Sequence, residues 1–388
     1  MNQYGLNKKE RYLMKKKIVV LGAGLVGSVM AVDLQKKYHI IAVDINQENL
    51  KTLNAAYGIE VKHADISNVK TLNKIIADSD LVIGSVPSHI GFKIVKNVIR
   101  AGKNIIDISF FTEDPFKLDK LAKENNVTAI VDCGVAPGLS NIILGYHNAQ
   151  MNVKKFECYV GGLPEKREWP WEYKTVFPPN ECIEEYLQTG RFIENGNIIL
   201  KEALSEPELI DFPVVGNLEA LYTDGLRTLI KTMDIPNMIE KTLRYPGITK
   251  YLKVLRDTGF FSHEEVQIGK SLVKPFDLTA ALLFPKWKIK SGEPEITAMR
   301  LIISGNENKK AKTYTYSLLD KFDYETNTTS MARTTGYTCT AVADLILSDK
   351  YNRKGIIPPE YIGEVGNNFE YIMEYLEARG IIFQLKIP

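Results

Sequence analysis

The chain has 388 residues, too many for one ordinary hydrophobic core, which favours two domains or one domain with a large insertion. Its 49 Lys and Arg against 47 Asp and Glu give a net charge of +2, which excludes the basic footprint typical of proteins that bind nucleic acid or anionic membranes. The chain has no apolar run near the roughly 20 residues of a membrane span, and its four widely spaced cysteines favour free thiols in a reducing cytoplasm.

The first structural signal follows a polar segment, 1–13, which we expect to be a disordered leader ahead of a natural start near Met14. The apolar run 18–21 leads directly into Gly22-Ala23-Gly24-Leu25-Val26-Gly27. A G-x-G-x-x-G string between a strand and a helix predicts a dinucleotide site, in which the glycines allow a tight turn, close approach of the pyrophosphate and close helix packing. The helix, expected to run to about Lys37, would offer its N-terminal amides to the pyrophosphate.

The second buried strand, 40–43, ends at Asp44. A carboxylate in this position can accept both hydroxyls of an adenine ribose. It would repel a 2′-phosphate, and the following Ile45-Asn46 provides no Arg to receive one. The sequence therefore predicts NAD as the cofactor.

Apolar runs and amphipathic helices then alternate, which predicts a doubly wound parallel sheet. We expect strands at 60–62, 81–85, 104–107 and 128–131, with helices such as 91–100 and 115–124 between them. The carboxyl ends of such strands line the cofactor crevice. Further cofactor contacts are therefore predicted at six positions, although ordinary loop chemistry explains each of them equally well: Asp65, Ser85, Val86, Pro87, Cys133 and Gly134.

The pattern changes after residue 132. We expect a strand at 156–160, a helical insertion over about 181–275, and an antiparallel pair at 298–305 and 311–319. The prediction is an α/β fold: a Rossmann-type NAD-binding domain of residues 14–132 plus about 331–388, and an α+β substrate and dimerisation domain of residues 133–330. The last helices, 341–348 and 369–379, would pack back on the first domain.

Several strings resemble the saccharopine dehydrogenase family over about residues 14–379. Asp132–Asn141 (DCGVAPGLSN) and Met331–Tyr337 (MARTTGY) resemble the wider family, whereas Thr223–Leu229 and Lys241–Gly247 resemble its lysine 6-dehydrogenase branch. Two positions depart from the family pattern: Trp171-Glu172 adds bulk and an acid before Tyr173-Lys174, and Ile248 replaces an expected histidine.

The resemblance implies NAD-dependent oxidation of the ε-amine of L-lysine to 2-aminoadipate 6-semialdehyde or piperideine-6-carboxylate, with release of ammonia, by a cytoplasmic homodimer. A base must take a proton from the ε-ammonium, whose reference pKa is about 10.4. An Arg would bind the carboxylate, and an acid would bind the α-ammonium. No metal is required, and the sequence contains no cluster with metal-ligand spacing.

Candidate residues for these roles come from the quoted strings. Asp107 is the first candidate base, with a buried ion pair as the alternative, and Glu113 and Asp114 are further candidates, although acids are common at helix starts. Arg227 and Arg244 are the candidates for the carboxylate, with an ordinary ion pair as the alternative for each. The remaining predicted substrate contacts are Tyr173, Lys174, Glu219 and Asp224.

Two other functions stay open. A saccharopine or carboxynorspermidine dehydrogenase is the first. Saccharopine carries three carboxylates, so convergence of Arg167, Arg191, Arg227, Arg244 and Arg333, together with NADP use, would favour it. The second is a non-catalytic dinucleotide-binding protein, which would lack a substrate-sized cavity.

Overall fold

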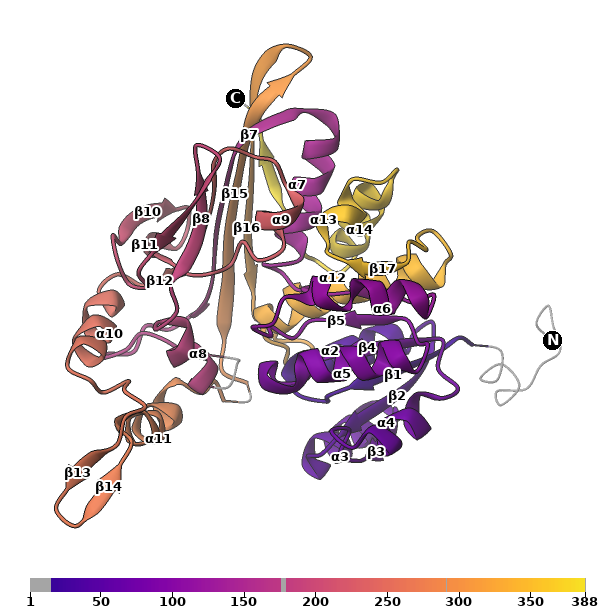
Figure 1. Cartoon of the computed structure of the whole chain (residues 1–388), viewed down its shortest axis with the longest axis horizontal. Helices are drawn as coiled ribbons and strands as arrows, with labels where there is room; N and C mark the ends of the chain where they lie inside the picture. Colours follow the sequence, from indigo (N-terminus) through magenta and orange to yellow (C-terminus); the bar gives the residue numbers. More distant parts are fainter. Residues whose placement is uncertain (1–14, 176–178, 291, 388) are drawn as a thin grey trace. The chain divides into compact units, whose positions relative to one another are not determined.

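The computed structural model describes residues 15–175, 179–290 and 292–387, so the expected leader lies outside the described residues. Contacts divide the chain into two compact units (Figure 1). Unit 1 comprises Met1–Ile142 and Thr335–Arg379, and unit 2 comprises Ile143–Thr334 and Gly380–Pro388. Unit 2 is therefore inserted into unit 1. After Arg379 the chain enters unit 2 again.

Unit 1 is built on a seven-stranded parallel sheet in the order β17-β6-β5-β4-β1-β2-β3. Its strands are β1 (Lys17–Leu21), β2 (His39–Asp44), β3 (Glu60–His63), β4 (Leu81–Gly84), β5 (Ile105–Asp107), β6 (Thr128–Ile130) and β17 (Gly355–Ile357). The six strands expected in this half of the sequence are confirmed. The central strands are buried on both sides, which explains their continuous apolar sequence.

Helices lie between these strands, as a parallel sheet requires, and two more follow the last strand of the sheet. They are α2 (Leu25–Leu34), α3 (Gln47–Tyr57), α4 (Val69–Ile76), α5 (Ser88–Arg100), the short η1 (Pro115–Leu118), α6 (Asp119–Glu124), α13 (Glu360–Gly363) and α14 (Asn368–Glu377). Helices α7 (Leu139–Gln150) and α12 (Ser330–Leu347) contain the points at which the chain passes between the units. Side-chain caps fix some helix starts; for example, Asn46 accepts from the amides of Glu48 and Asn49 at α3.

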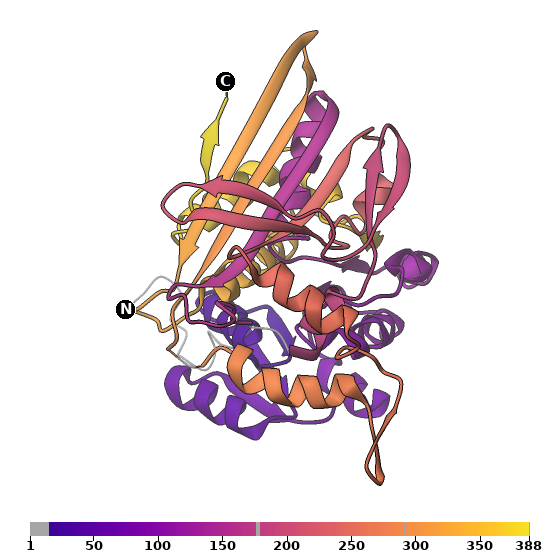
Figure 2. The ribbon, with the colours of Figure 1, turned by 90° about the vertical axis from the view of Figure 1, so that its left-hand side faces the viewer.

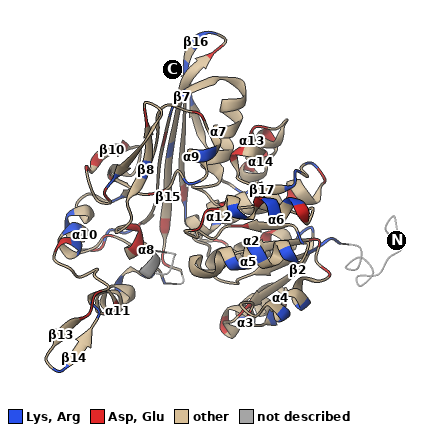
Figure 3. Cartoon of the chain, in the orientation of Figure 1, with Lys and Arg blue, Asp and Glu red and all other residues tan. Residues whose placement is uncertain are grey.

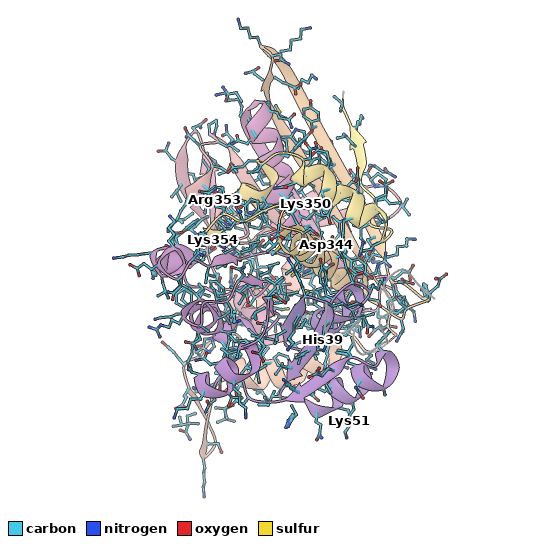
Figure 4. The ribbon with its side chains drawn as sticks, turned by 90° about the vertical axis from the view of Figure 1, so that its right-hand side faces the viewer. His39, Lys51, Asp344, Lys350, Arg353 and Lys354 are labelled. Atoms are coloured by element: carbon cyan, nitrogen blue, oxygen red, sulfur yellow. The ribbon has the colours of Figure 1, made fainter. Side chains whose placement is uncertain are left out.

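The C-terminal helices of unit 1 are attached to α2 by buried carboxylates. Asp33, which is 4% exposed, accepts hydrogen bonds from Thr340 on α12, from Tyr375 on α14 and from Arg379. Asp344 on α12, labelled in Figure 4, accepts from Lys37 at 2.6 Å and also from Tyr38 and Tyr371. The expected packing of the last helices on the first domain therefore depends on specific polar contacts as well as apolar ones.

Unit 2 contains a mixed sheet of nine strands. Its main path is β10-β11-β12-β7-β15-β16-β18, and β8 and β9 attach to it through β12. The strands are β7 (Asn152–Pro164), β8 (Gly190–Glu194), β9 (Asn197–Lys201), β10 (Glu208–Phe212), β11 (Gly216–Tyr222), β12 (Met238–Arg244), β15 (Glu295–Glu307), β16 (Lys310–Lys321) and β18 (Gln384–Lys386). Figure 2 shows the long strands β7, β15 and β16 side by side, and the predicted β15–β16 hairpin is confirmed.

Four helices and a separate hairpin complete unit 2. They are α8 (Pro179–Glu185), α9 (Leu229–Thr232), α10 (Ile248–Asp257), α11 (Pro275–Trp287), and the hairpin of β13 (Val266–Ile268) and β14 (Ser271–Val273). The expected helical insertion over 181–275 is wrong, because more residues of this segment form strands, β8 to β14, than form helices. Strand β12 shows the reason: its sequence MIEKTLR places charged residues in a buried central strand, and such a mixture resembles an amphipathic helix.

Candidate functional site

The glycine string forms a tight turn between β1 and α2. Gly22 has φ +100°, and a Cβ there would lie 2.0 Å from the carbonyl oxygen of Ser85. A Cβ at Gly27 would lie 2.0 Å from the Gly22 carbonyl oxygen, whereas a Cβ at Gly24 would meet nothing within 4 Å. Gly22 and Gly27 are therefore required by the fold, and Gly24 leaves open space at a helix N-terminus that no side chain caps. This arrangement fits the pyrophosphate of a dinucleotide.

Asp44 lies beside this turn at the end of β2. Its Oδ2 accepts a hydrogen bond from the Ala23 amide at 2.6 Å, and its Oδ1 accepts one from the Asn46 amide at 2.7 Å. These bonds fix a partly exposed carboxylate next to the open side of the glycine turn. The residues present therefore fit the adenosine half of a nicotinamide dinucleotide.

The other predicted cofactor contacts lie at strand ends of unit 1. Ser85 and Val86 are half-buried after β4, and the exposed Pro87 precedes α5. Asp65 is exposed, and its hydrogen bonds from Ser67 lower its pKa.

The buried Cys133 and Gly134 belong to a compact loop, in which the Gly134 amide donates to the Pro137 carbonyl at 3.1 Å. Cys133 also contacts the thiol of Cys339. Burial raises the pKa of the Cys339 thiol. The role of these residues toward a cofactor stays a prediction.

The three candidate bases have different surroundings. Asp107 is 0% exposed, and its Oδ1 accepts from the amide of Ser109 at 2.9 Å and from its hydroxyl at 2.5 Å. A Cβ at Gly84 would lie 2.0 Å from Asp107 Oδ2, so this carboxylate packs against backbone. Asp114 accepts from the Phe116 amide and caps η1, whereas Glu113 is exposed.

A buried polar cluster occupies one face of β12 in unit 2. Glu240, Thr242 and Arg244 share this face because side chains alternate along a strand. We use the name β12 cluster for these three residues together with Thr223, Glu185 and Tyr186.

Arg244 forms one end of the β12 cluster. It is 6% exposed, and its Nε donates to the Tyr186 hydroxyl at 3.0 Å. Its Nη2 lies 3.5 Å from Glu185 Oε2, and the guanidinium carbon lies 4.8 Å from the ring centre of Tyr173. The guanidinium is thus held by aromatic and hydroxyl groups and only loosely by a carboxylate, which suits a second, stronger anionic ligand.

Glu240 forms the other end of the β12 cluster. Its Oε2 lies 2.9 Å from Thr223 Oγ1, and a Cβ at Gly225 would lie 1.9 Å from the same oxygen. Burial raises the pKa of Glu240 to about 8, with a smaller contribution in the same direction from Glu185. A carboxyl group with such a pKa can take up or release a proton near neutral pH.

The remaining predicted substrate contacts are engaged elsewhere in unit 2. Lys174 pairs with Glu293 at 2.9 Å. Glu219 accepts from the amides of Gly247 and Thr249 at the start of α10, and Asp224 holds Arg191 in a two-pronged ion pair. Arg227 is half-buried with a left-handed backbone at φ 45°. The structure thus brings together Arg244 and Tyr173 from the predicted set.

Three of the other arginines of unit 2 have acidic partners of their own. Arg167 pairs with Glu172 at 2.6 Å and Arg191 with Asp224 at 2.7 Å. Arg333 pairs with Asp320 and Asp323. These arginines therefore lie in separate ion pairs and do not join the β12 cluster.

The sequence analysis did not assign roles to Glu185, Tyr186, Thr223, Glu240 or Thr242. The alternation of Glu240, Thr242 and Arg244 was the available signal, because polar residues at every second position predict a polar strand face. Pairing with Thr223 and Glu185 depends on tertiary structure and leaves no local pattern.

Other kinds of site find no support in the described part of the chain. Within residues 15–175, 179–290 and 292–387, no group of three or more His, Cys, Asp or Glu is placed to hold a metal ion. In the same residues, no helix has the length and apolar character needed to cross a membrane. Figure 3 shows basic and acidic residues interspersed along both units.

Comparisons with known proteins agree with this two-unit organisation. The model of the saccharopine dehydrogenase NADP binding domain matches residues 18–130, and that of the saccharopine dehydrogenase C-terminal domain matches residues 134–381. The chain is 27% identical over 280 residues to the NADP(+), L-glutamate-forming saccharopine dehydrogenase of Pyricularia oryzae, covering 66% of this chain and 61% of the relative. It is 22% identical to an alpha-aminoadipic semialdehyde synthase of Arabidopsis thaliana, covering 90% of this chain and 43% of the relative.

A solved structure shares the fold. The apo saccharopine dehydrogenase (L-Glu forming) of Saccharomyces cerevisiae superposes with a TM-score of 0.79 at 18% identity, covering 96% of this chain and 100% of that one. Unit 1 therefore contains a nicotinamide dinucleotide-binding domain of Rossmann type. With both family models together matching most of its length, the chain belongs to the saccharopine dehydrogenase family.

Proposed function

We propose that this chain is an NAD-dependent lysine 6-dehydrogenase, which oxidises the ε-amine of L-lysine to 2-aminoadipate 6-semialdehyde and releases ammonia. The charge of the β12 cluster is the observation that carries this proposal. One buried guanidinium, that of Arg244, lies in the same cluster as the buried carboxyl group of Glu240 and the partly exposed one of Glu185. Lysine brings one carboxylate and two amines, so its charges complement this set.

A dinucleotide held by the glycine turn and Asp44 would supply the hydride acceptor for the ε-carbon of lysine. The Arg244 guanidinium binds the substrate carboxylate, which displaces the weak contact with Glu185 at 3.5 Å. Tyr173 and Tyr186 keep the guanidinium in place. The carboxyl groups of the cluster attract the ammonium and take its proton, because only a neutral amine can release hydride. Water then converts the resulting imine into aldehyde and ammonia.

Asp44 supports NAD as the cofactor of this reaction. Backbone amides of Ala23 and Asn46 orient its carboxylate toward the space where an adenine ribose would lie. A 2′-phosphate there would meet a negative charge in place of the Arg that NADP sites commonly use.

A second candidate function is an NADP-dependent saccharopine dehydrogenase, which the printed names of the relatives favour. The chain spans 61% and 60% of the length of the first two relatives. Saccharopine carries three carboxylates and would need more than one guanidinium. Because Arg167, Arg191 and Arg333 each hold an acid of their own, the lysine proposal has the stronger support.

We also propose that the enzyme is a homodimer joined through unit 2. The β13–β14 hairpin pairs with no third strand among the described residues, and it exposes Val266, Ile268 and Leu272. On the neighbouring α11, Leu278 and Leu282 are also exposed. A second copy that covers these apolar side chains would stabilise a hairpin that is marginal by itself.

The test is the appearance of NADH absorbance when purified protein is mixed with NAD and L-lysine, beside L-saccharopine and a control without amine. The Arg244→Lys variant keeps the charge but loses the two-pronged geometry, so it should raise KM for lysine at least about tenfold. Arg300→Lys, at an arginine that donates to the Asp211 carbonyl, is the matched control.

Reduction of NAD with lysine supports the proposal. Reduction of NADP with saccharopine alone would replace it with the second candidate. A protein that binds dinucleotide but oxidises neither amine would contradict both.

A further inference from the structure

Three oxygen–oxygen contacts form an unbroken row in the β12 cluster. Thr223 Oγ1 lies 2.9 Å from Glu240 Oε2 and 2.9 Å from Thr242 Oγ1. Thr242 Oγ1 in turn lies 3.0 Å from Glu185 Oε1. The row connects buried Glu240 with Glu185, whose side chain is 33% exposed.

The number of hydrogens in this row depends on the protonation of its two ends. Each of the three contacts needs one hydrogen between its two oxygens. The hydroxyls of Thr223 and Thr242 supply one hydrogen each, and an ionised carboxylate supplies none. With Glu240 and Glu185 both ionised, the row is one hydrogen short. One proton on either glutamate makes all three contacts hydrogen bonds.

The row can be completed in two ways. With the proton on Glu240, both hydroxyls donate in the direction of Glu185; with the proton on Glu185, both donate in the direction of Glu240. The two arrangements interconvert when each of three hydrogens moves across one contact. Three O–H bonds break and three form, so one proton passes between the carboxyl groups without transfer of electrons.

The surroundings favour the proton at Glu240. Burial raises the pKa of Glu240 most, and Glu185 and Asp224, which Arg191 holds, raise it further, whereas the hydrogen bonds from Thr223 and the Gly225 amide lower it. Glu185 instead lies 3.5 Å from the guanidinium of Arg244, and its side chain is 33% exposed. Further titratable groups near this face are Tyr173, Tyr186 and the buried Cys182 beside Arg244 and Glu185, and Cys158, which pairs in register with Glu240 on β7.

We propose that Glu240, Thr223, Thr242 and Glu185 form a proton relay that stores one proton at Glu240 and exchanges it with the substrate amine through Glu185. This inference rests on the proposed function. Above about pH 8, where Glu240 has released its proton, the row is one hydrogen short. The lysine ammonium then transfers a proton to Glu185, so an N–H bond breaks and an O–H bond forms. The relay delivers a proton to the ionised Glu240 and leaves a neutral amine that can release hydride. The stored proton returns by the same row to the departing ammonia.

Infrared spectroscopy of the full chain without substrate tests directly whether Glu240 holds a proton. The wild type should show a carboxylic-acid carbonyl band near neutral pH that disappears as the pH rises through about 8, and Glu240→Gln should lack it. In Thr223→Val the acid loses the oxygen to which it donates, so its band should move to higher wavenumber. Thr223→Ser keeps the hydroxyl and should restore the wild-type position.

Steady-state kinetics test the relay in turnover. Thr223→Val should lower kcat for lysine at least about tenfold with KM changed less than about twofold, because proton transfer contributes about 100-fold or more in comparable enzymes. Thr223→Ser should retain most of the activity. Thr297→Val is the matched control, since this buried threonine on β15 has a hydroxyl with no hydrogen-bond partner among the described residues.

The relay is overturned if no carbonyl band depends on Glu240, or if Thr223→Val and Thr223→Ser behave alike in both experiments. The infrared result does not require turnover. If the band follows Glu240 and Thr223 as expected while lysine is not oxidised, the relay is supported and the proposed substrate is wrong.

Discussion

Single side chains determine how this protein responds to pH, and Glu240 is the clearest case. The folded-state pKa of Glu240, about 8, lies above its ordinary value of 4.5, so the folded chain binds a proton that the unfolded chain releases between these values. The stabilising contribution of this proton is complete below about pH 4.5 and is lost as the pH rises through about 8. Glu295, whose pKa burial raises to about 7, acts in the same direction.

Glu240→Gln keeps an N–H donor toward Thr223 but has no charge. Between pH 5 and 8, its free energy of unfolding should decline less steeply than that of the wild type, by about 1.4 kcal/mol per pH unit. Urea denaturation followed by circular dichroism at several pH values measures these slopes. Equal slopes in the two proteins would show that Glu240 is ionised throughout this range.

Gly22 and Gly24 belong to one motif but serve different purposes. Gly22→Ala places a Cβ 2.0 Å from the Ser85 carbonyl oxygen at φ +100°, so it should lower the free energy of unfolding by about 2 kcal/mol or more. Gly24→Ala meets nothing within 4 Å and should change stability by less than about 1 kcal/mol, yet weaken NAD binding. Denaturation and isothermal titration separate the two effects. Equal loss of stability in both variants would contradict this division.

Asp44 is the residue on which cofactor choice depends. Asp44→Ser removes the carboxylate that accepts the ribose hydroxyls and repels a 2′-phosphate, so Kd for NAD should rise about tenfold or more while Kd for NADP falls. Fluorescence titration with both cofactors gives the ratio. Glu48→Ala, an exposed acid in the first turn of α3, is the control. A preference of the wild type for NADP would contradict the assignment of Asp44.

Helices of unit 1 that are distant in sequence depend on one buried ion pair. Asp33 on α2 is nearly inaccessible, and Arg379 after α14 donates to both of its carboxylate oxygens at 2.9 Å. Arg379→Met leaves a buried charge with fewer partners and should lower the free energy of unfolding by about 3 kcal/mol.

Lys36→Met provides the comparison. The exposed Lys36 lies 3.6 Å from the carboxylate of Asp33, so its ion pair should contribute less than about 1 kcal/mol to the free energy of unfolding. Thermal denaturation of the two variants tests the contrast. An equal decrease in the free energy of unfolding for Arg379→Met and Lys36→Met would show that Arg379 is not the main partner that neutralises Asp33.

The elements also show what the sequence could and could not predict. Most of the six predicted strands of unit 1 are apolar runs between turn residues and helices. The exception in composition is β3, whose sequence EVKH is mostly exposed, and the seventh strand of the sheet, β17, was not predicted. In the segment 181–275, buried charges such as Glu240 and Arg244 made strands resemble helices. The glycine turn and Asp44 lie close together in sequence and could be recognised, whereas the β12 cluster assembles residues from α8, β12 and the end of β11. Such a cluster needs the register of the sheet, which no local pattern provides.

The molecule as a whole should be a dimer through the β13–β14 hairpin, which extends beyond α11 at the lower left of Figure 1. Leu272 and Leu282 are 62% and 64% exposed. The double variant Leu272→Glu and Leu282→Glu places charges on this apolar surface and should give a monomer in sedimentation velocity. Val214→Glu, at an exposed apolar residue between β10 and β11, should leave the dimer intact. A wild-type monomer would contradict this interface.

The chain passes between the two units three times, the last time after Arg379. A ribosome releases these segments in order, so the strands from β7 to β16 emerge while unit 1 still lacks β17 and α14. The inserted unit can form its sheet as far as β16 during translation, but β18 (Gln384–Lys386) joins this sheet only after α14 has been synthesised. Asp33 can form its ion pair only after Arg379, more than three hundred residues later in the chain, has been synthesised. In a growing polypeptide, the dinucleotide-binding unit therefore begins first, and Arg379 completes its contacts just before β18 is added to the sheet of unit 2.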